Sequence, residues 1–263
     1  MIEHFKKFDK GGKSLLPLSF SHLNEFAFYR ERWALKRIFG YEFPSSASAV
    51  RGQSVESGLN MVLNGLSTSE ASQKMIEEYD ANCSKLTDPK IDIERENLIP
   101  LFELGAKKFQ EYAFQWNLLN YQKKVELDIQ GIPFIGYTDF HFEDKNTKED
   151  FFIDLKTSKT MPSEPSMSHK MQQAIYQKAT NSRQMLWYLK NPTKTKDAEW
   201  SQIEVMDYET PFKVCNHIIT VMSNFLKSVN SEDDIKMALV PNIDNWIWKE
   251  DTVKKARLEV WGF

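Results

Sequence analysis

The spacing of apolar residues changes once along the chain, near Tyr121. Upstream of that point, apolar positions recur every three or four residues, as at Val55, Leu59 and Val62, which is the period of an amphipathic helix. This pattern predicts helices over residues 19–39, 51–65, 68–82 and 92–119. Residues 1–18 show no regular period and are expected to form a loose lead-in.

Downstream of Tyr121, apolar and polar residues alternate, which is typical of strands with one buried face. Strands are expected at 123–130, 132–142 and 151–158, joined by a turn at Gly131 and by the polar run 143–150. Three strands linked in this way are predicted to form an antiparallel meander.

The remaining pattern predicts a helix, two strands, a helix and an irregular tail rich in tryptophan, at 168–180, 183–190, 199–206, 209–228 and beyond. The order of helix, three-strand antiparallel meander, helix and strand predicts an α/β core with added N- and C-terminal helices. We expect a single domain over residues 1–263. It would have a mostly helical part at 1–120, a sheet core at 121–206 and a helical part at 207–263.

Composition narrows the class of protein without choosing a function. The 263 residues are 41% hydrophobic and 27% charged, with a formal net charge of -3, as in an ordinary globular protein. This balance argues against a protein that coats duplex DNA, but it allows an enzyme with a local basic groove. No apolar run is long enough to cross a membrane and the first residues lack the apolar core of a secretory signal. We therefore expect a soluble, cytoplasmic protein with no membrane partner.

The segment from Ile153 to Lys156 is the main candidate for chemistry. On a strand alternate side chains share a face, so Asp154 and Lys156 point one way while Ile153 and Leu155 point into the core. A carboxylate and an ammonium group placed like this can meet one ligand, the first through a metal ion and the second through a phosphate or a water molecule.

The Asp-x-Lys pattern alone is weak evidence, since it should occur about once by chance in a chain of this size. Two further copies stand at 88–90 and 234–236. The first contains a proline within a polar loop, and the second resembles the start of a helix. Only the copy at 154–156 follows an apolar strand and has a strand-borne carboxylate upstream, at Asp139.

Two further acidic residues complete a possible metal site. Asp139 lies on the strand before Asp154, and a short turn would bring the two strands side by side. Glu56 lies early in a helix whose other face is apolar and is the best third carboxylate. Three carboxylates that converge form a suitable cage for a hard divalent cation such as Mg²⁺.

Four short motifs in this order resemble those of the PD-(D/E)XK nucleases, in their RecB-like branch. They are Gly52-x-x-x-Glu56, Gly136-x-x-Asp139, Asp154-x-Lys156 and Gln172-x-x-x-Tyr176, and the lead LSFSHLNEF is similar to the first helix of that branch. The resemblance covers roughly residues 50–190. It implies one or two Mg²⁺ or Mn²⁺ ions held by Glu56, Asp139, Asp154 and Leu155.

The resemblance also implies roles for the other motif residues. Lys156 would position or activate the attacking water, and Gln172 and Tyr176, four residues apart on one helix face, would approach the site. We predict phosphate contacts at further polar residues near these motifs, namely Arg51, Thr157, Ser158, Lys159 and Lys170.

Two departures from the family pattern refine this expectation. Many relatives have a histidine where this chain has Glu56, whereas viral recombination exonucleases have an acid there. Several relatives hold an iron–sulfur cluster with four cysteines, but this chain has only Cys83 and Cys215, so we expect no cluster.

The run at 11–14, Gly-Gly-Lys-Ser, lacks the earlier glycine and the preceding strand of a phosphate-binding loop, so we expect no ATP site.

These observations predict a metal-dependent DNA exonuclease of recombination or repair, of viral or bacterial type, which could work with a single-strand annealing or binding protein. Three alternatives stay open. The same fold could serve a site- or structure-specific endonuclease, or a disabled nuclease that only binds nucleic acid, and the motifs could be coincidental in an unrelated binding protein. The sequence predicts neither the polarity and strand preference of cleavage nor the oligomeric state.

Overall fold

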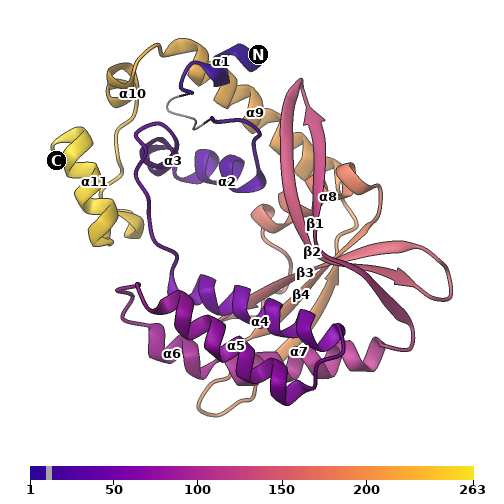
Figure 1. Cartoon of the computed structure of the whole chain (residues 1–263). Coiled ribbons are helices and arrows are strands. Elements are labelled where there is room, and N and C mark those ends of the chain that lie inside the picture. Colours follow the sequence, from indigo (N-terminus) through magenta and orange to yellow (C-terminus); the bar gives the residue numbers. More distant parts are fainter. Residues whose placement is uncertain (10–13) are drawn as a thin grey trace. The chain divides into compact units, whose positions relative to one another are not determined.

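The computed structural model describes residues 1–9 and 14–263, so most of the run at 11–14 lies outside the described residues (Figure 1). The chain forms two compact units. The first, which we call the terminal unit, comprises Met1–Phe43, Val125–Gly136 and Asp207–Phe263. The second, which we call the sheet unit, comprises Pro44–Lys124 and Tyr137–Met206. Whether the chain is one domain, as predicted, stays a prediction.

The helices and strands follow the predicted order closely from residue 47 to residue 204. Their bounds are α4 (Ala47–Leu63), α5 (Thr68–Cys83), α6 (Ile91–Glu96), α7 (Leu98–Tyr112), β1 (Trp116–Ile129), β2 (Ile132–Asp144), β3 (Asp150–Ser158), α8 (Met167–Thr180), β4 (Arg183–Lys190) and β5 (Glu199–Glu204). The strands form a five-stranded sheet in the order β1-β2-β3-β4-β5. This arrangement confirms the predicted α/β fold class.

The connections between strands give the sheet its mixed direction. β1 and β2 are joined by Gln130 and Gly131, both at positive φ (58° and 79°), as a two-residue hairpin turn requires. β3 pairs antiparallel with β2 and parallel with β4, while β5 is antiparallel to β4. A parallel pair needs a crossover, and α8 supplies it between β3 and β4.

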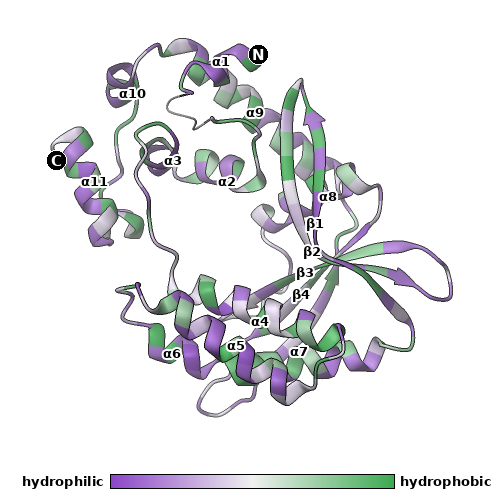
Figure 2. Ribbon diagram, viewed as in Figure 1, coloured by the Kyte–Doolittle hydropathy of each residue, from purple (hydrophilic) through white to green (hydrophobic). Residues whose placement is uncertain are grey.

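Helices α4 and α7 cover one face of the sheet, and α5 packs against these two helices. Their apolar side chains pack with those of β2, β3 and β4 in one cluster, in which the Phe109 ring stacks on Trp187 with centroids 4.4 Å apart. Ile153 and Leu155 belong to this cluster. Figure 2 shows hydrophobic and hydrophilic residues interleaved along α5 and α7, as expected of helices with a single buried face.

The helix predicted over 92–119 is wrong in two places. Asn97 separates α6 from α7 and donates from its side-chain amide to the carbonyl of Ile93, which closes the end of α6. The chain then leaves the helix after Tyr112, and Trp116 begins β1. The Trp116 ring stacks on Tyr112 at 4.1 Å and meets Phe151 edge-on, so packing against the sheet outweighs the helical period.

The terminal unit is more regular than the sequence indicated. Its elements are α1 (Ile2–Lys6), α2 (Phe20–Phe28), α3 (Arg30–Arg37), α9 (Glu209–Ser228), α10 (Glu232–Ala238), η1 (Trp246–Lys249) and α11 (Asp251–Trp261). The predicted helix 19–39 breaks at Tyr29, whose backbone leaves the helical region. The prediction of a loose lead-in is wrong, because the chain begins with helix α1. The prediction of an irregular tail is also wrong, because Trp248 and Val253 of the tail are buried with Leu35 in a small core. In the described part of the chain, no helix is long and apolar enough to cross a membrane.

A buried ion pair ties α4 to α6 inside the sheet unit. Arg51 on α4 is 2% exposed and Glu94 on α6 is fully buried, and the two side chains are in direct contact. Arg51 also donates to the hydroxyl of Thr157 on β3, at 3.0 Å. One guanidinium group therefore fixes α4 relative to both α6 and the strand that carries Asp154.

We expect Glu94→Ala to lower the free energy of unfolding by about 3–5 kcal/mol, because it leaves the Arg51 charge buried without its carboxylate. Asp80→Ala is the matched control, since Asp80 forms a two-bond pair with Arg95 in which both side chains are about half exposed. That change should cost no more than about 1 kcal/mol. Urea unfolding measures both values, and an equal cost for the two variants would contradict the structural role of Arg51.

Candidate functional site

The candidate site lies where β2 and β3 cease to pair. The paired residues run from Glu143 and Asp150 to Phe140 and Ile153, and the next pair in this register would be Asp139 and Asp154. At that level the main-chain N–H of Leu155 donates instead to Asp139 Oδ2, at 2.8 Å. The Asp139 carboxylate thus takes the place of a backbone carbonyl as the acceptor, and this hydrogen bond holds Asp139 beside β3.

Asp154 and Lys156 share the face of β3 opposite the helical core, as the strand alternation predicts. Asp154 is 2% exposed, and its Oδ2 lies 2.5 Å from Lys156 Nζ. Within the described residues, Asp154 Oδ1 is buried and has no hydrogen-bond partner. A buried carboxylate oxygen without a partner is costly, so this atom is available to a ligand.

Helix α8 brings Gln172 and Tyr176 to the same place. Lys156 Nζ donates to Gln172 Oε1 at 3.1 Å, and Gln172 Nε2 donates to the Tyr176 hydroxyl at 3.2 Å. The Tyr176 hydroxyl donates to the carbonyl of Tyr137 on β2, at 2.8 Å. Burial, followed by the charge of Asp154, raises the pKa of Tyr176 to about 12, so this hydroxyl keeps its proton. The chain of bonds holds Lys156 in one position.

Glu56 approaches the acidic pair from α4. Its carboxylate accepts from Gln122 Nε2 at 3.3 Å and from the hydroxyl of Tyr121, which itself accepts from Gln122 at 3.2 Å. Sequence reasoning missed Tyr121 and Gln122, although they lie where the apolar period changes. A tyrosine within a strand carries no signal that would separate a carboxylate partner from a core residue.

The pKa shifts show that the four predicted groups act on one another. Burial raises the pKa of Asp139 well above its ordinary value, and the charges of Asp154 and Glu56 raise it further. Burial and Asp154 also raise the pKa of Glu56. Burial lowers the pKa of Lys156, but the charges of Asp154 and Asp139 outweigh it and the net shift is upward. Three carboxylates and a single ammonium group thus influence one another electrostatically, and Asp154 is the one in direct contact with Lys156 among the contacts of the described residues.

The donor set fits a hard divalent cation in its chemistry. Carboxylate oxygens are the ligands that Mg²⁺ and Mn²⁺ prefer, and the free Asp154 Oδ1 is one such donor. Leu155 could contribute only its main-chain carbonyl. In the residues that the structure describes, no three acidic, histidine or cysteine side chains are grouped so that they could together hold a metal ion. The other carboxylate oxygen of Asp154, Oδ2, is in contact with the ammonium group of Lys156.

Among the predicted phosphate contacts, Arg51 and Thr157 bond to each other inside the sheet unit. The guanidinium of Arg51 is buried against Glu94, so the structure places it in the scaffold and disfavours a direct contact with nucleic acid. Ser158, at the end of β3, is partly exposed and donates to the carbonyl of Thr160 at 2.6 Å.

The two predicted lysines lie nearer the surface. Lys159 has a side chain 65% exposed, with Nζ 3.9 Å from Glu94 Oε1. Lys170, on α8, pairs with the exposed Glu164 at 3.1 Å. Each pair has one solvent-exposed side chain, and such pairs are weak enough for a phosphate to compete for the lysine, so these two side chains stay our predicted contacts.

A second pair of side chains beside Lys156 was missed by sequence reasoning. His169 on α8 and Tyr188 on β4 lie with Nδ1 and Oη 2.7 Å apart. Tyr188 is the partner of Lys156 in the parallel register of β3 and β4. His169 precedes Gln172 by three residues, a spacing that places both on one helix face.

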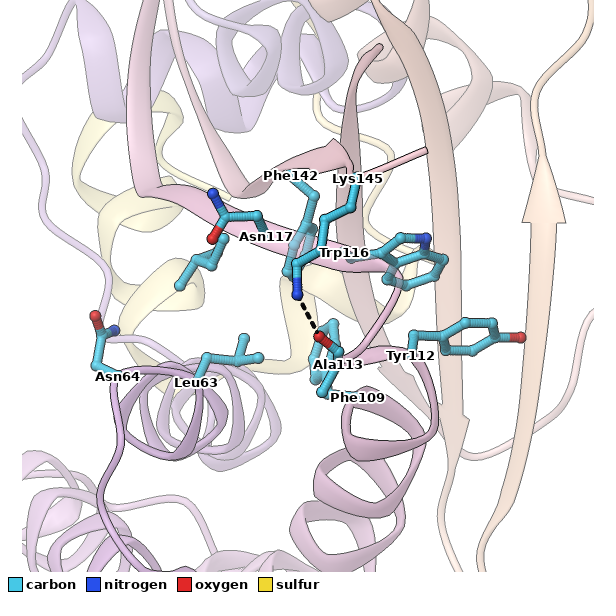
Figure 3. A pocket seen from close by; sticks show the side chains of 10 residues that line it. Leu63, Asn64, Phe109, Tyr112, Ala113, Trp116, Asn117, Phe142 and Lys145 are labelled. Carbon is cyan, nitrogen blue, oxygen red and sulfur yellow. Dashed lines mark hydrogen bonds between the residues drawn. The ribbon is translucent and has the colours of Figure 1, made fainter. Parts of the chain in front are cut away.

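The pocket drawn in Figure 3 is separate from this constellation. It has a volume of about 260 Å³ and lies between the ends of α4 and α7 and the adjoining strands. Its lining residues are Leu63, Asn64, Phe109, Tyr112, Ala113, Trp116, Asn117, Leu118, Phe142 and Lys145. Lys145 Nζ is tied to the carbonyl of Ala113 at 2.8 Å, as the dashed line in Figure 3 marks. None of the predicted site residues lines this pocket.

The repulsion among the carboxylates should be measurable as stability. We expect Asp139→Asn to raise the melting temperature at pH 7 in the presence of a chelator, because it removes one charge and keeps an oxygen for the Leu155 N–H. Each kcal/mol gained corresponds to about 2–4 °C in a chain of this size.

The sign of the pH dependence follows from the raised pKa of Asp139. The folded protein holds this proton more tightly than the unfolded chain, so the ionised carboxylate costs stability above the folded-state pKa. The advantage of Asp139→Asn should therefore fade as the pH falls toward the ordinary value of 3.8. A melting temperature of Asp139→Asn equal to or below that of the wild type at pH 7 would contradict the raised pKa.

Comparison with known proteins identifies the family. A search of curated proteins finds no match. Solved structures do match, and one, described as the crystal structure of SSO0001, is 15% identical, with 74% of this chain and 88% of that chain covered and a TM-score of 0.34. The model of the PD-(D/E)XK nuclease superfamily matches residues 17–238. Because this match spans most of the sequence and includes every predicted site residue, the chain belongs to the PD-(D/E)XK nuclease superfamily.

Proposed function

We propose that this protein is a divalent-metal-dependent deoxyribonuclease, an exonuclease that hydrolyses phosphodiester bonds from DNA ends. The observation that carries the proposal is the convergence of Asp139, Asp154 and Lys156, from two strands, beside Glu56 of α4. A bound Mg²⁺ or Mn²⁺ would polarise the scissile phosphate and lower the pKa of a water molecule. Glu56, Asp139, Asp154 and the carbonyl of Leu155 would hold it.

The residues of this chain have distinct tasks in that reaction. Lys156 supplies positive charge to the phosphate as negative charge develops in the transition state, and it orients the attacking water. Gln172 and Tyr176 are positioning residues, because they bond in series from Lys156 to the main chain of β2. A lysine held at both Asp154 and Gln172 loses little freedom when the substrate binds.

Exonuclease activity rests on the resemblance to the RecB-like branch, together with the acid at Glu56. We expect no iron–sulfur cluster, since the chain has two cysteines, Cys83 and Cys215, and both are buried. We assign the protein on the same grounds to recombination or repair, in a bacterial or viral setting. A protein that binds or anneals single strands is a suitable partner for an enzyme that exposes them.

End-labelled linear DNA and closed circular DNA, single- and double-stranded, test the proposal when incubated with Mg²⁺ or with EDTA. We expect metal-dependent release of nucleotides from linear DNA, intact circles and no reaction in EDTA. Asp154→Ala should abolish cleavage because it removes a metal ligand. Lys156→Ala should slow it by about 100-fold or more, as the loss of one charge-stabilising donor does in other enzymes.

Lys236→Ala is the matched control, since Lys236 belongs to another Asp-x-Lys copy, on α10, and pairs with the exposed Asp233. It should cleave like the wild type, and circular dichroism should show all variants folded. Cleavage of circles would replace the exonuclease by an endonuclease. Binding of DNA without cleavage would indicate a disabled nuclease, and wild-type activity in Asp154→Ala would overturn the assigned site.

A further inference from the structure

The face of α8 that meets β3 and β4 carries a third polar side chain. His169, Gln172 and Tyr176 are spaced by three and four residues and share one helix face. Each bonds to a different part of the site, and His169 does so through Tyr188. The main-chain N–H of His169 donates to Ser166, the N-cap of α8, which fixes the start of this face. In the proposed reaction Gln172 and Tyr176 position Lys156, whereas His169 has no role so far.

The acceptor that the Tyr188 hydroxyl needs decides which ring nitrogen of His169 carries the proton. Tyr188 is 1% exposed, so its hydroxyl needs an acceptor within the protein. Among the described residues that acceptor is His169 Nδ1, at 2.7 Å. A nitrogen that accepts carries no proton in a neutral imidazole, so the ring proton lies on Nε2.

Both partners stay neutral at ordinary pH. Burial is the main cause that raises the pKa of Tyr188 to about 12, so the phenol keeps its proton and remains a donor. Burial and the nearby charge of Lys156 lower the pKa of His169, which keeps the imidazole neutral. Tyr188 therefore locks one tautomer of His169 and leaves its Nε2–H, which has no hydrogen-bond partner in the described part of the chain, as a free donor.

We propose that His169 is a further DNA-contacting residue, whose Nε2–H donates to a non-bridging phosphate oxygen next to the scissile bond. This inference rests on the proposed function. Tyr188 is then a positioning residue, because it acts on the DNA only through the tautomer of His169. The class of ligand is a phosphodiester, and the contact needs no base recognition.

The charge of the site favours a neutral donor at this position. The Lys156 ammonium already neutralises Asp154, at 2.5 Å, and Tyr188 pairs with Lys156 across the strands. A second cation here would repel Lys156 and would compete for the carboxylates. A neutral N–H can bind a phosphate oxygen without either effect, and it is pre-oriented by a buried hydroxyl.

Two substitutions of His169 separate a DNA contact from a purely structural role. In His169→Asn the side-chain oxygen can still accept from Tyr188, but the distal donor is lost. In His169→Gln a distal N–H donor is kept, while the acceptor for Tyr188 is lost. A structural role predicts that Asn is tolerated and Gln is not, whereas the DNA contact predicts the reverse for binding.

We would measure the binding of a short fluorescent linear duplex by anisotropy, with Ca²⁺ in place of Mg²⁺ to prevent cleavage, and the KM and kcat with Mg²⁺. We expect His169→Asn to weaken binding by about 10- to 100-fold, the range for a hydrogen bond to a charged group. Its KM should rise more than its kcat falls, with an unchanged melting temperature. His169→Gln should bind close to the wild type. Ring ¹⁵N spectra should show the proton of His169 on Nε2 in the wild type and a mixture of tautomers in Tyr188→Phe.

Wild-type binding by His169→Asn, or an equal loss of binding in His169→Asn and His169→Gln, would overturn the inference and leave the proposed function intact. Ring spectra with the proton on Nδ1 in the wild type would overturn it too. A wild-type protein that neither binds nor cleaves DNA would overturn the proposed function and this inference together.

Discussion

The site depends on the contact between Lys156 Nζ and Asp154 Oδ2, made inside a group of three carboxylates. One ammonium group cannot neutralise three ionised acids, and the raised pKa values of Asp139 and Glu56 reflect how unfavourable it is to ionise all three next to a buried oxygen without a partner. Such an arrangement costs free energy in the protein alone. The fold tolerates this cost because the strands and helices that carry the acids are fixed by contacts elsewhere in the sheet unit.

Those contacts lie on both sides of β3. On the helical side, Arg51 bonds to Glu94 and Thr157 and so sets α4, the helix of Glu56, against the strand. On the other side, α8 is bound at Lys156 through Gln172 and at β2 through Tyr176. Arg51 and Thr157, close in sequence to the candidate residues Glu56 and Lys156, therefore serve the scaffold, which explains why Arg51 is buried.

The sequence predicted the core of the fold well, because the β2 and β3 segments alternate, the β4 segment is a short apolar run and the α8 segment has a helical period. It failed where packing overrides the local pattern. Trp116 leaves the predicted helix to stack on Tyr112, and Trp248 orders a tail that reads as irregular. In the candidate site, the three acids and Lys156 could be proposed from motif and order, and their assignment as site residues stays a prediction. Tyr121 and Tyr188 could not, because the pattern of a buried aromatic residue is the same whether or not its hydroxyl serves a neighbour.

Under the proposed function, ionisation of the three acids would also link the binding of a cation to the binding of DNA. Three carboxylates repel a phosphate, and Lys156, engaged by Asp154, offsets only part of that repulsion. A divalent cation at the acids would cancel the excess and would free the ammonium group to face the phosphate. Each ligand thus raises the affinity for the other, since a coupling between two sites acts equally in both directions. A basic surface is then unnecessary for productive binding, which reconciles the net charge of -3 with an enzyme whose substrate is a polyanion.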